Sequence, residues 1–308
     1  MNNSFKIYKS MKIVFAFLFA LFILLACNKS QLNYIDYYNK VNEIDSIYRF
    51  ANQPILAVKK YKKLFKKYPP KSTEYFREYE TFIVLSYKNN IKFGGKKSLI
   101  KLIDLIAPYS MFGWEKQYYP IFNKYKMDSI DIKKQLLKWE NNKNHILLDS
   151  FSNAMIRDQM YRSGKNADWD EVPKQDKKNT NLLKWTFENY GYPSIYKIGF
   201  GKDKNNQIGM NALFLHMAES TEYSLLKQNL YKYVKSGDCP PEIYASMIDR
   251  YESRNNNKLI FGEYRLFMDD TYLDSVKINA NRKSIGLPSL KHKDKLIKDH
   301  YKFKNLLK

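Results

Sequence analysis

Two side chains that can carry charge lie on the apolar stripe of one expected helix. The segment HILLDSFSNAMIRDQMYRSG, which begins at His145, has the pattern of a helix closed by Gly164. At about 100° per residue, Asp158 lies roughly 20° from Phe151, and Arg162 lies roughly 20° to the other side. A carboxylate among apolar side chains costs free energy unless it is paired, so the guanidinium one turn away is its expected partner.

The next expected helix repeats this placement of polar groups. Within EVPKQDKKNTNLLKWTFENYGYP, Asp176 and Asn179 share a stripe with Leu183 and Phe187, and Gly191 ends the pattern. Two helices are therefore predicted to point polar side chains toward the same interior.

Two later segments add a histidine and an acid-base pair. GMNALFLHMAES is apolar nearly all round, which predicts that its His216 is inside the protein. PPEIYASMIDRYES reads as a helix begun by prolines, and it carries Asp249 next to Arg250. Arg250 shares a side of that helix with Met247.

Convergence of these residues would create a site with several possible chemistries. The candidate residues are Asp158, Arg162, Asp176, Asn179, His216, Asp249 and Arg250. A histidine beside carboxylates can act as a general base, with one acid holding its tautomer, while an arginine binds an anionic group. Two acids and a histidine can instead surround a metal ion. The spacing favours neither chemistry, so no catalytic residue is assigned and no metal or cofactor is expected.

Marked catalytic motifs are missing from the sequence. It has no His-x-x-x-His pair, no glycine-rich phosphate loop and no nucleophile elbow, which removes the better-marked zinc, nucleotide and esterase chemistries. The same polar residues can also form a buried network that fixes how helices pack, provided that each member is satisfied. We therefore expect a binding or scaffold module. The alternative is an enzyme, such as a hydrolase, or a pocket for a small anionic ligand.

The order of the polar residues and glycines resembles a family pattern. The ordered set is Arg157-Asp158-Gln159, Arg162, Asp176, Asn179, Gly191 with Pro193, His216, Gly237, Asp249-Arg250, Gly262, Arg282 and Gly286-Leu287-Pro288. It resembles the bacterial domain-of-unknown-function family 6624 over about residues 145–290. The resemblance implies a domain boundary but no activity.

The chain departs from that family pattern at two places. The family has a glutamine before the histidine and a Tyr-Gly-Thr-Gln element after the Asp-Arg pair. Here Leu215 precedes the histidine, and the later element reads Phe261-Gly262-Glu263-Tyr264. If that element binds a ligand through its hydroxyls and amide, this chain has lost part of the site or changed its specificity.

The N-terminus has the pattern of a lipoprotein signal peptide. A lysine-containing leader precedes the apolar segment 13–26, which is shorter than the roughly 20 residues that cross a bilayer. The segment ends in Leu-Leu-Ala-Cys, which resembles the bacterial lipobox, where the chain is cut before the cysteine and the cysteine is acylated. Residues 1–26 are therefore predicted to be a signal peptide, and Cys27 the lipidation site. Each buried methylene of an acyl chain contributes about 0.8 kcal/mol to anchoring.

The residues after Cys27 bear on location. Asn28 stands where an aspartate would resemble the inner-membrane retention signal, which favours the outer membrane. No acidic run follows, which favours a face turned to the periplasm. The expected partners are the lipid bilayer, through acylated Cys27, and a protein or an anionic envelope component.

Length, charge and cysteine content limit the domain organisation and the kinds of partner that this chain can have. At 308 residues and 44% hydrophobic, the chain can bury a sizeable core, and the length suits two modest domains. The net charge of +22 would ordinarily suggest nucleic acid. An exported chain whose lysines come with abundant asparagine, tyrosine and isoleucine argues against that partner and leaves anionic headgroups or polysaccharide. Besides Cys27 the chain has only Cys239, so the mature chain has no intramolecular disulfide.

The predicted fold is mainly α. Residues 27–40 are polar and aromatic without clear period, which predicts a tether, and 41–140 are expected to form helical hairpins. These pack beside the helical domain of 145–290, which includes a short strand pair or extended loop near 258–273. The tail, 291–308, is basic and weakly patterned, and its order is left open.

Local signals mark the hairpins. Pro54 suits the first turn of a helix that Pro69-Pro70 stops, Ser72 is a candidate cap, and Gly94-Gly95 precedes another helix. Paired amphipathic helices resemble tetratricopeptide hairpins, although no fixed period is found. Six lysines between 59 and 67 cover one face of the first of these helices. That face is expected to be solvated, with membrane contact as the alternative.

Overall fold

The computed structural model describes residues 32–71, 77–162, 167–200, 208–264 and 275–303. Residues 33 onward form one compact unit. The predictions for the signal peptide, Cys27, the Ser72 cap, the Gly164 stop and residues 265–273 fall outside the described part of the chain.

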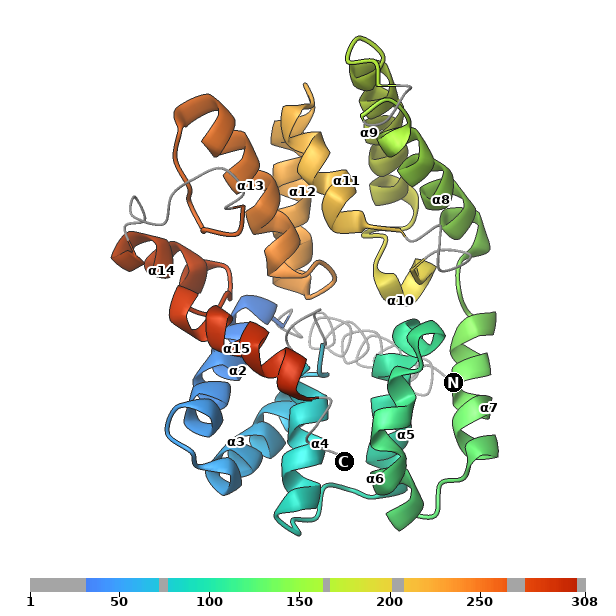
Figure 1. Ribbon diagram of the computed structural model, residues 1–308, viewed down its shortest axis with the longest axis vertical. Coiled ribbons are helices and arrows are strands. Elements are labelled where there is room, and N and C mark those ends of the chain that lie inside the picture. The colour runs from blue at the N-terminus through green and yellow to red at the C-terminus, as the bar shows by residue number, and fades with distance from the viewer. Residues whose placement is uncertain (1–31, 72–76, 163–166, 201–207, 265–274, 304–308) are drawn as a thin grey trace, which may run out of the picture. The chain divides into compact units, whose positions relative to one another are not determined.

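The first half of the described chain consists of helices joined by short turns (Figure 1). The helices are α2 (Tyr34–Arg49), α3 (Pro54–Lys67), α4 (Glu78–Lys88), α5 (Lys96–Ile106), α6 (Tyr119–Lys124) and α7 (Ser129–Asn141), with 3₁₀ turns η1 (Ala107–Phe112) and η2 (Trp114–Tyr118). Helix α3 packs against both α2 and α4, and α5 packs against α7. Neighbouring helices therefore pair, as the hairpin pattern predicts.

The second half is helical as well. Its elements are α8 (His145–Met160), α9 (Val172–Asn189), α10 (Ile195–Ile198), α11 (Met210–His216), η4 (Met217–Glu219), α12 (Tyr223–Ser236), α13 (Pro241–Asn256), α14 (Ser275–Ser284) and α15 (Leu290–Phe303). Helix α8 packs on α9, while α11 and α12 both pack on α13. The mainly α prediction is confirmed. Among the described residues there is no strand, and 258–264 form a loop.

Side-chain signals account for several helix ends. Asn144 accepts a hydrogen bond from the backbone N–H of Leu147 at 3.0 Å, which caps α8. Pro54 and Pro241 occupy first-turn positions of their helices, where a missing N–H costs nothing. The core of the second half lies where α8, α9, α11, α12 and α13 meet. Its fully buried members include Phe151, Leu183, Phe214, Leu226 and Met247.

The tether prediction is wrong for residues 34–40, which belong to α2. The tyrosines that lacked a clear period are buried, and two of them lie against glycines far along the chain. A Cβ at Gly237 would lie 2.5 Å from the Tyr34 ring, and one at Gly286 would lie 2.8 Å from the Tyr38 Cβ. Glycine is needed at both places, because each also has positive φ. Helix α2 is therefore part of the fold and not a linker.

The described part of the basic tail, residues 291–303, belongs to helix α15 (Figure 1). It packs beside α2 through buried polar contacts. His292 Nε2 lies 2.7 Å from an Asp45 carboxylate oxygen, and Arg49 donates to Asp299 at 2.7 Å. Asp45 is 2% exposed and His292 is 4% exposed, so this contact lies inside the molecule.

Helix α3 has the predicted two-sided character. Ala57, Tyr61 and Leu64 are buried, and the six lysines from 59 to 67 are exposed. No helix in the described ranges is both long and apolar enough to span a bilayer.

Candidate functional site

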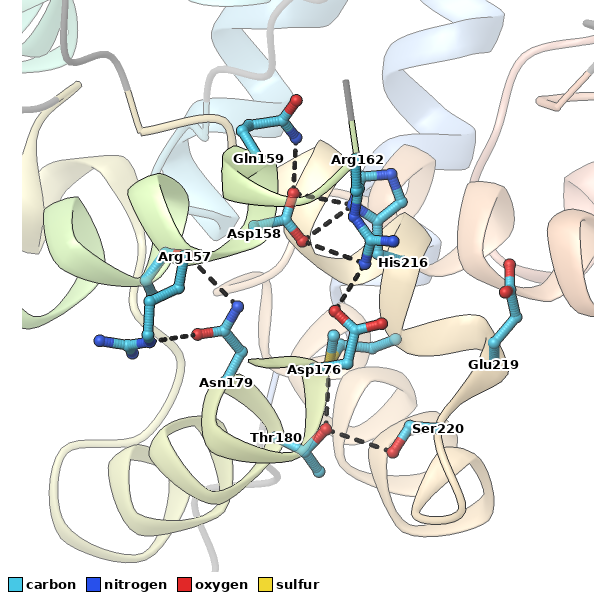
Figure 2. A network of polar contacts seen from close by, with 12 residues as sticks. Arg157, Asp158, Gln159, Arg162, Asp176, Asn179, Thr180, His216, Glu219 and Ser220 are labelled. Carbon is cyan, nitrogen blue, oxygen red and sulfur yellow. Dashed lines mark hydrogen bonds and ion pairs between the residues drawn. The ribbon is translucent and has the colours of Figure 1, made fainter. Parts of the chain in front are cut away.

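Asp158 is the centre of a polar network between α8, α9 and α11 (Figure 2). Its carboxylate is completely buried, and both of its oxygens lie 2.8 Å from Nδ1 of His216. The neighbouring Gln159 amide donates to Asp158 at 2.6 Å, and Arg162 Nη2 lies 3.6 Å away. The buried carboxylate is thus surrounded by donors, as a charge inside a protein must be.

Arg162 joins this carboxylate to a second one. Its Nη2 donates to Asp176 on α9 at 2.5 Å, so one guanidinium serves two acids from two helices. Burial raises the pKa of the Asp176 carboxyl, and the Arg162 guanidinium partly offsets that rise. The sequence pattern of α8 and α9 therefore does bring Asp158, Arg162 and Asp176 together.

His216 is oriented by its acid. A carboxylate only accepts hydrogen bonds, so Nδ1 carries the proton in the contact with Asp158. The imidazole is only partly enclosed, with 15% of the side chain exposed, although its segment had suggested complete burial. An imidazole held in this tautomer presents Nε2 as a base, which is the arrangement used in general-base catalysis.

Asn179 lies about one turn after Asp176 on α9, and its side chain connects α9 to α8. Its amide donates to the Ala154 carbonyl on α8 at 3.2 Å, and its oxygen accepts from Arg157 at 3.2 Å. Nearby, the Thr180 hydroxyl donates to Met217 Sδ at 3.0 Å (Figure 2). These bonds attach α9 to α8 and to η4.

The prediction that Asp249 joins the same cluster is wrong. Asp249 is fully buried, and its carboxylate accepts hydrogen bonds from the backbone amides of residues 260, 261, 263 and 264 at 2.6 to 3.4 Å. Burial raises its pKa, and the four amide donors oppose that rise. Asp249 thus holds the loop that contains Phe261-Gly262-Glu263-Tyr264, and it makes no hydrogen bond to the Asp158 network among the described residues.

Arg250 also makes its hydrogen bonds outside the Asp158 network. Its Nε and Nη2 donate to one carboxylate oxygen of Glu219 at 2.9 and 2.6 Å, which links α13 to η4. Arg254 adds a second cation to the same carboxylate at 2.9 Å. With its guanidinium engaged in this way, Arg250 stabilises the packing of α13.

Sequence reasoning missed a cavity of about 640 Å³ whose lining includes Met155 of α8 and Met210 of α11. Its wall includes aromatic side chains from α2 and from the segment around α10, and the first two turns of α13. The lining residues whose side chains carry a hydroxyl group or a charge include Tyr38, Tyr192, Tyr196, Glu242, Glu263 and Lys293. None of Asp158, Arg162, Asp176 and His216 lines it. The size is in the range of small-molecule sites, roughly 300 to 1,000 Å³.

Cys239 lies close to this cavity in sequence, just before the lining residue Pro240. The Cys239 thiol is fully buried, and burial raises its pKa. It is therefore a neutral core residue at physiological pH.

The acids and the histidine of the site raise the question of a metal ion. In the part of the chain that the structure describes, no three His, Cys, Asp or Glu side chains are grouped so as to hold a metal ion. The Asp158 network combines two acids and a histidine with one guanidinium that lies within ion-pair distance of both acids.

Comparisons with known proteins add no assignment. No family model, curated protein or solved structure matches this chain. The family resemblance over residues 145–290 therefore stays a prediction from ordered motifs.

Proposed function

We propose that the chain is a bacterial lipoprotein, held at the outer membrane by acylated Cys27, whose periplasm-facing folded part is a binding module for a small molecule. The cavity of about 640 Å³ carries this proposal. It is lined by aromatic and apolar side chains with a few charged ones, which is the usual make-up of a ligand site. In the Asp158 network, in contrast, the carboxylates of Asp158 and Asp176 already accept hydrogen bonds from described side chains.

Blocking the cavity tests the binding function. Ser246 on α13 lines the cavity, whereas Ser253 on the same helix does not. We expect the full chain in phospholipid nanodiscs to retain small molecules from a bacterial envelope extract, as detected by mass spectrometry. Ser246→Phe should abolish that retention, because the ring takes up space in the cavity that a ligand needs, and Ser253→Phe should preserve it. Equal retention by both variants, or none by the parent chain, would contradict the proposal.

The anchor is tested separately. In a bacterial host given radiolabelled palmitate, the parent chain should become labelled and sediment with membranes. Cys27→Ser should remove essentially all of the label, because the other thiol of the sequence, that of Cys239, is fully buried. A chain that stays labelled after this substitution would rule out Cys27 as the lipidation site.

A hydrolytic enzyme is the second candidate, favoured by the Asp158–His216 pair. The 2.8 Å contact at Nδ1 and the partial exposure of the imidazole suit a general base. This candidate requires that a retained compound be converted with time. His216→Gln should then slow conversion by about 100-fold or more while binding persists.

A further inference from the structure

Glu242 is a half-buried residue of the cavity wall, and one of its carboxylate oxygens is buried and unused as an acceptor. It lies in the first turn of α13, just after Pro241. Its Oε2 is buried and accepts no hydrogen bond from any described residue. Buried carboxylate oxygens nearly always have a donor, and leaving one without costs free energy. Because the residue Glu242 lines the cavity, a ligand donor that reached this carboxylate would meet an acceptor that no described residue uses.

The cations near Glu242 and elsewhere in the lining make ion pairs with other acids. Glu263, which also lines the cavity, accepts from Arg282 Nη1 at 2.8 Å and from Lys293 Nζ. At another part of the lining, Lys71 lies 3.6 Å from Asp238. Within the described lining, Glu242 is therefore the acid that no cation neutralises by an ion pair.

The rest of the wall suits an apolar body that carries positive charge. Tyr38, Tyr192, Tyr196 and Phe200 contribute aromatic rings to the lining. Aromatic faces attract cations, and they also bury the hydrocarbon part of a ligand. An anionic ligand would instead meet an unneutralised carboxylate.

We propose that the cavity binds a small organic cation whose ammonium group donates to Glu242 and whose apolar body lies among the tyrosines. This inference rests on the proposed binding function and names its ligand class. Protonated primary or secondary amines fit best, because the acceptor needs an N–H donor and a quaternary ammonium has none.

The ionisation of Glu242 agrees with this assignment. Burial raises its pKa to about 7, Glu263 adds to the rise, and Lys293 and Arg282 oppose it. A bound ammonium supplies the missing opposite charge and so favours the ionised carboxylate.

Three small molecules of similar shape but different charge distinguish the effect of ligand charge on affinity from the effect of ligand shape. Cyclohexylmethylamine, cyclohexylmethanol and cyclohexanecarboxylate are titrated calorimetrically at pH 7.5 into the full chain in nanodiscs. We expect the protonated amine to bind about tenfold to a hundredfold more tightly than the alcohol, because a charge-assisted hydrogen bond is stronger than a neutral one. The carboxylate should bind most weakly.

Glu242→Gln keeps the shape and removes the charge, so it should bring amine affinity down to that of the alcohol. Glu252→Gln is the matched control on α13, since Glu252 pairs with Lys258 and does not line the cavity. If Glu242→Gln fails to fold, Ser246→Lys replaces it, and there the amine should lose affinity while the carboxylate gains it.

Equal binding of amine and alcohol, unchanged in Glu242→Gln, would overturn the cation assignment, and so would an absence of amine binding by the parent chain. The binding function is judged independently by envelope compounds that the parent retains and Ser246→Phe does not. Its failure would show as loss of that retention in the parent itself.

Discussion

Asp158→Asn is expected to lower the free energy of unfolding by roughly 3 to 5 kcal/mol, the usual cost of breaking a buried charged pair. The Asp158 side chain is fully buried and contacts His216, Gln159 and Arg162. Its neutral amide would leave Arg162 with one acid instead of two. It would also place an N–H₂ group among donors, where an acceptor is needed.

The measurement is urea unfolding of the purified chain, followed by tryptophan fluorescence. Asp294→Asn is the control, because Asp294 is exposed on α15, and its effect should stay within about 0.5 kcal/mol. Asp176→Asn should fall between the two, since 16% of that side chain is exposed. Unchanged or raised stability in Asp158→Asn would mean that the fold keeps this acid for function, which would favour the enzyme candidate.

The free energy of unfolding of the parent chain is also expected to fall as the pH rises from about 5 to about 8. Burial raises the pKa of Glu78 to about 8, and of Glu80 and Glu242 to about 7, from an ordinary value of 4.5. The unfolded chain releases these protons near pH 4.5, while the folded chain keeps them up to pH 7 or 8. Folding therefore takes up protons across this window, and raising the pH opposes it.

Glu78 should account for a large part of this fall in stability with rising pH. It is 2% exposed, accepts a hydrogen bond from the Tyr37 hydroxyl, and has no described partner for Oε2. Glu78→Gln cannot ionise, so its urea midpoint should change less between pH 5 and pH 8 than that of the parent. Glu43→Gln, at an exposed residue paired with Lys40, should keep the parent slope. A parent midpoint that rises over this range would contradict the assignment.

The sequence predicted the part of the site that depends on helical spacing. Asp158 and Arg162 are four residues apart, so their proximity follows from one helix, and the apolar stripe indicated which way they point. Asp249 and Arg250 show where such reasoning stops. The groups that donate hydrogen bonds to Asp249 are backbone amides 11 to 15 residues later, and Arg250 pairs with Glu219, 31 residues earlier. Backbone amides have no signature in a sequence.

The same limit applies to α2 and to the cavity. Proline and glycine positions predicted where several helices begin and end, because those signals act locally. The tyrosines of α2 lacked a helical stripe of their own because they are buried against glycines about 200 to 250 residues later. A cavity is a gap left by imperfect packing of distant elements, so Glu242 had nothing in its neighbourhood to distinguish it from a first-turn glutamate.

The pairing of α2 with α15 has a consequence for when the chain can fold. Asp45 and Arg49 are made early, but His292 and Asp299 follow 247 and 250 residues later. Contacts of such long sequence separation form slowly, and here they cannot form before synthesis is nearly finished. A polypeptide that crosses a membrane through a narrow channel must do so unfolded. Late closure of the first helix against the last would keep this chain competent for the export that its N-terminal pattern predicts.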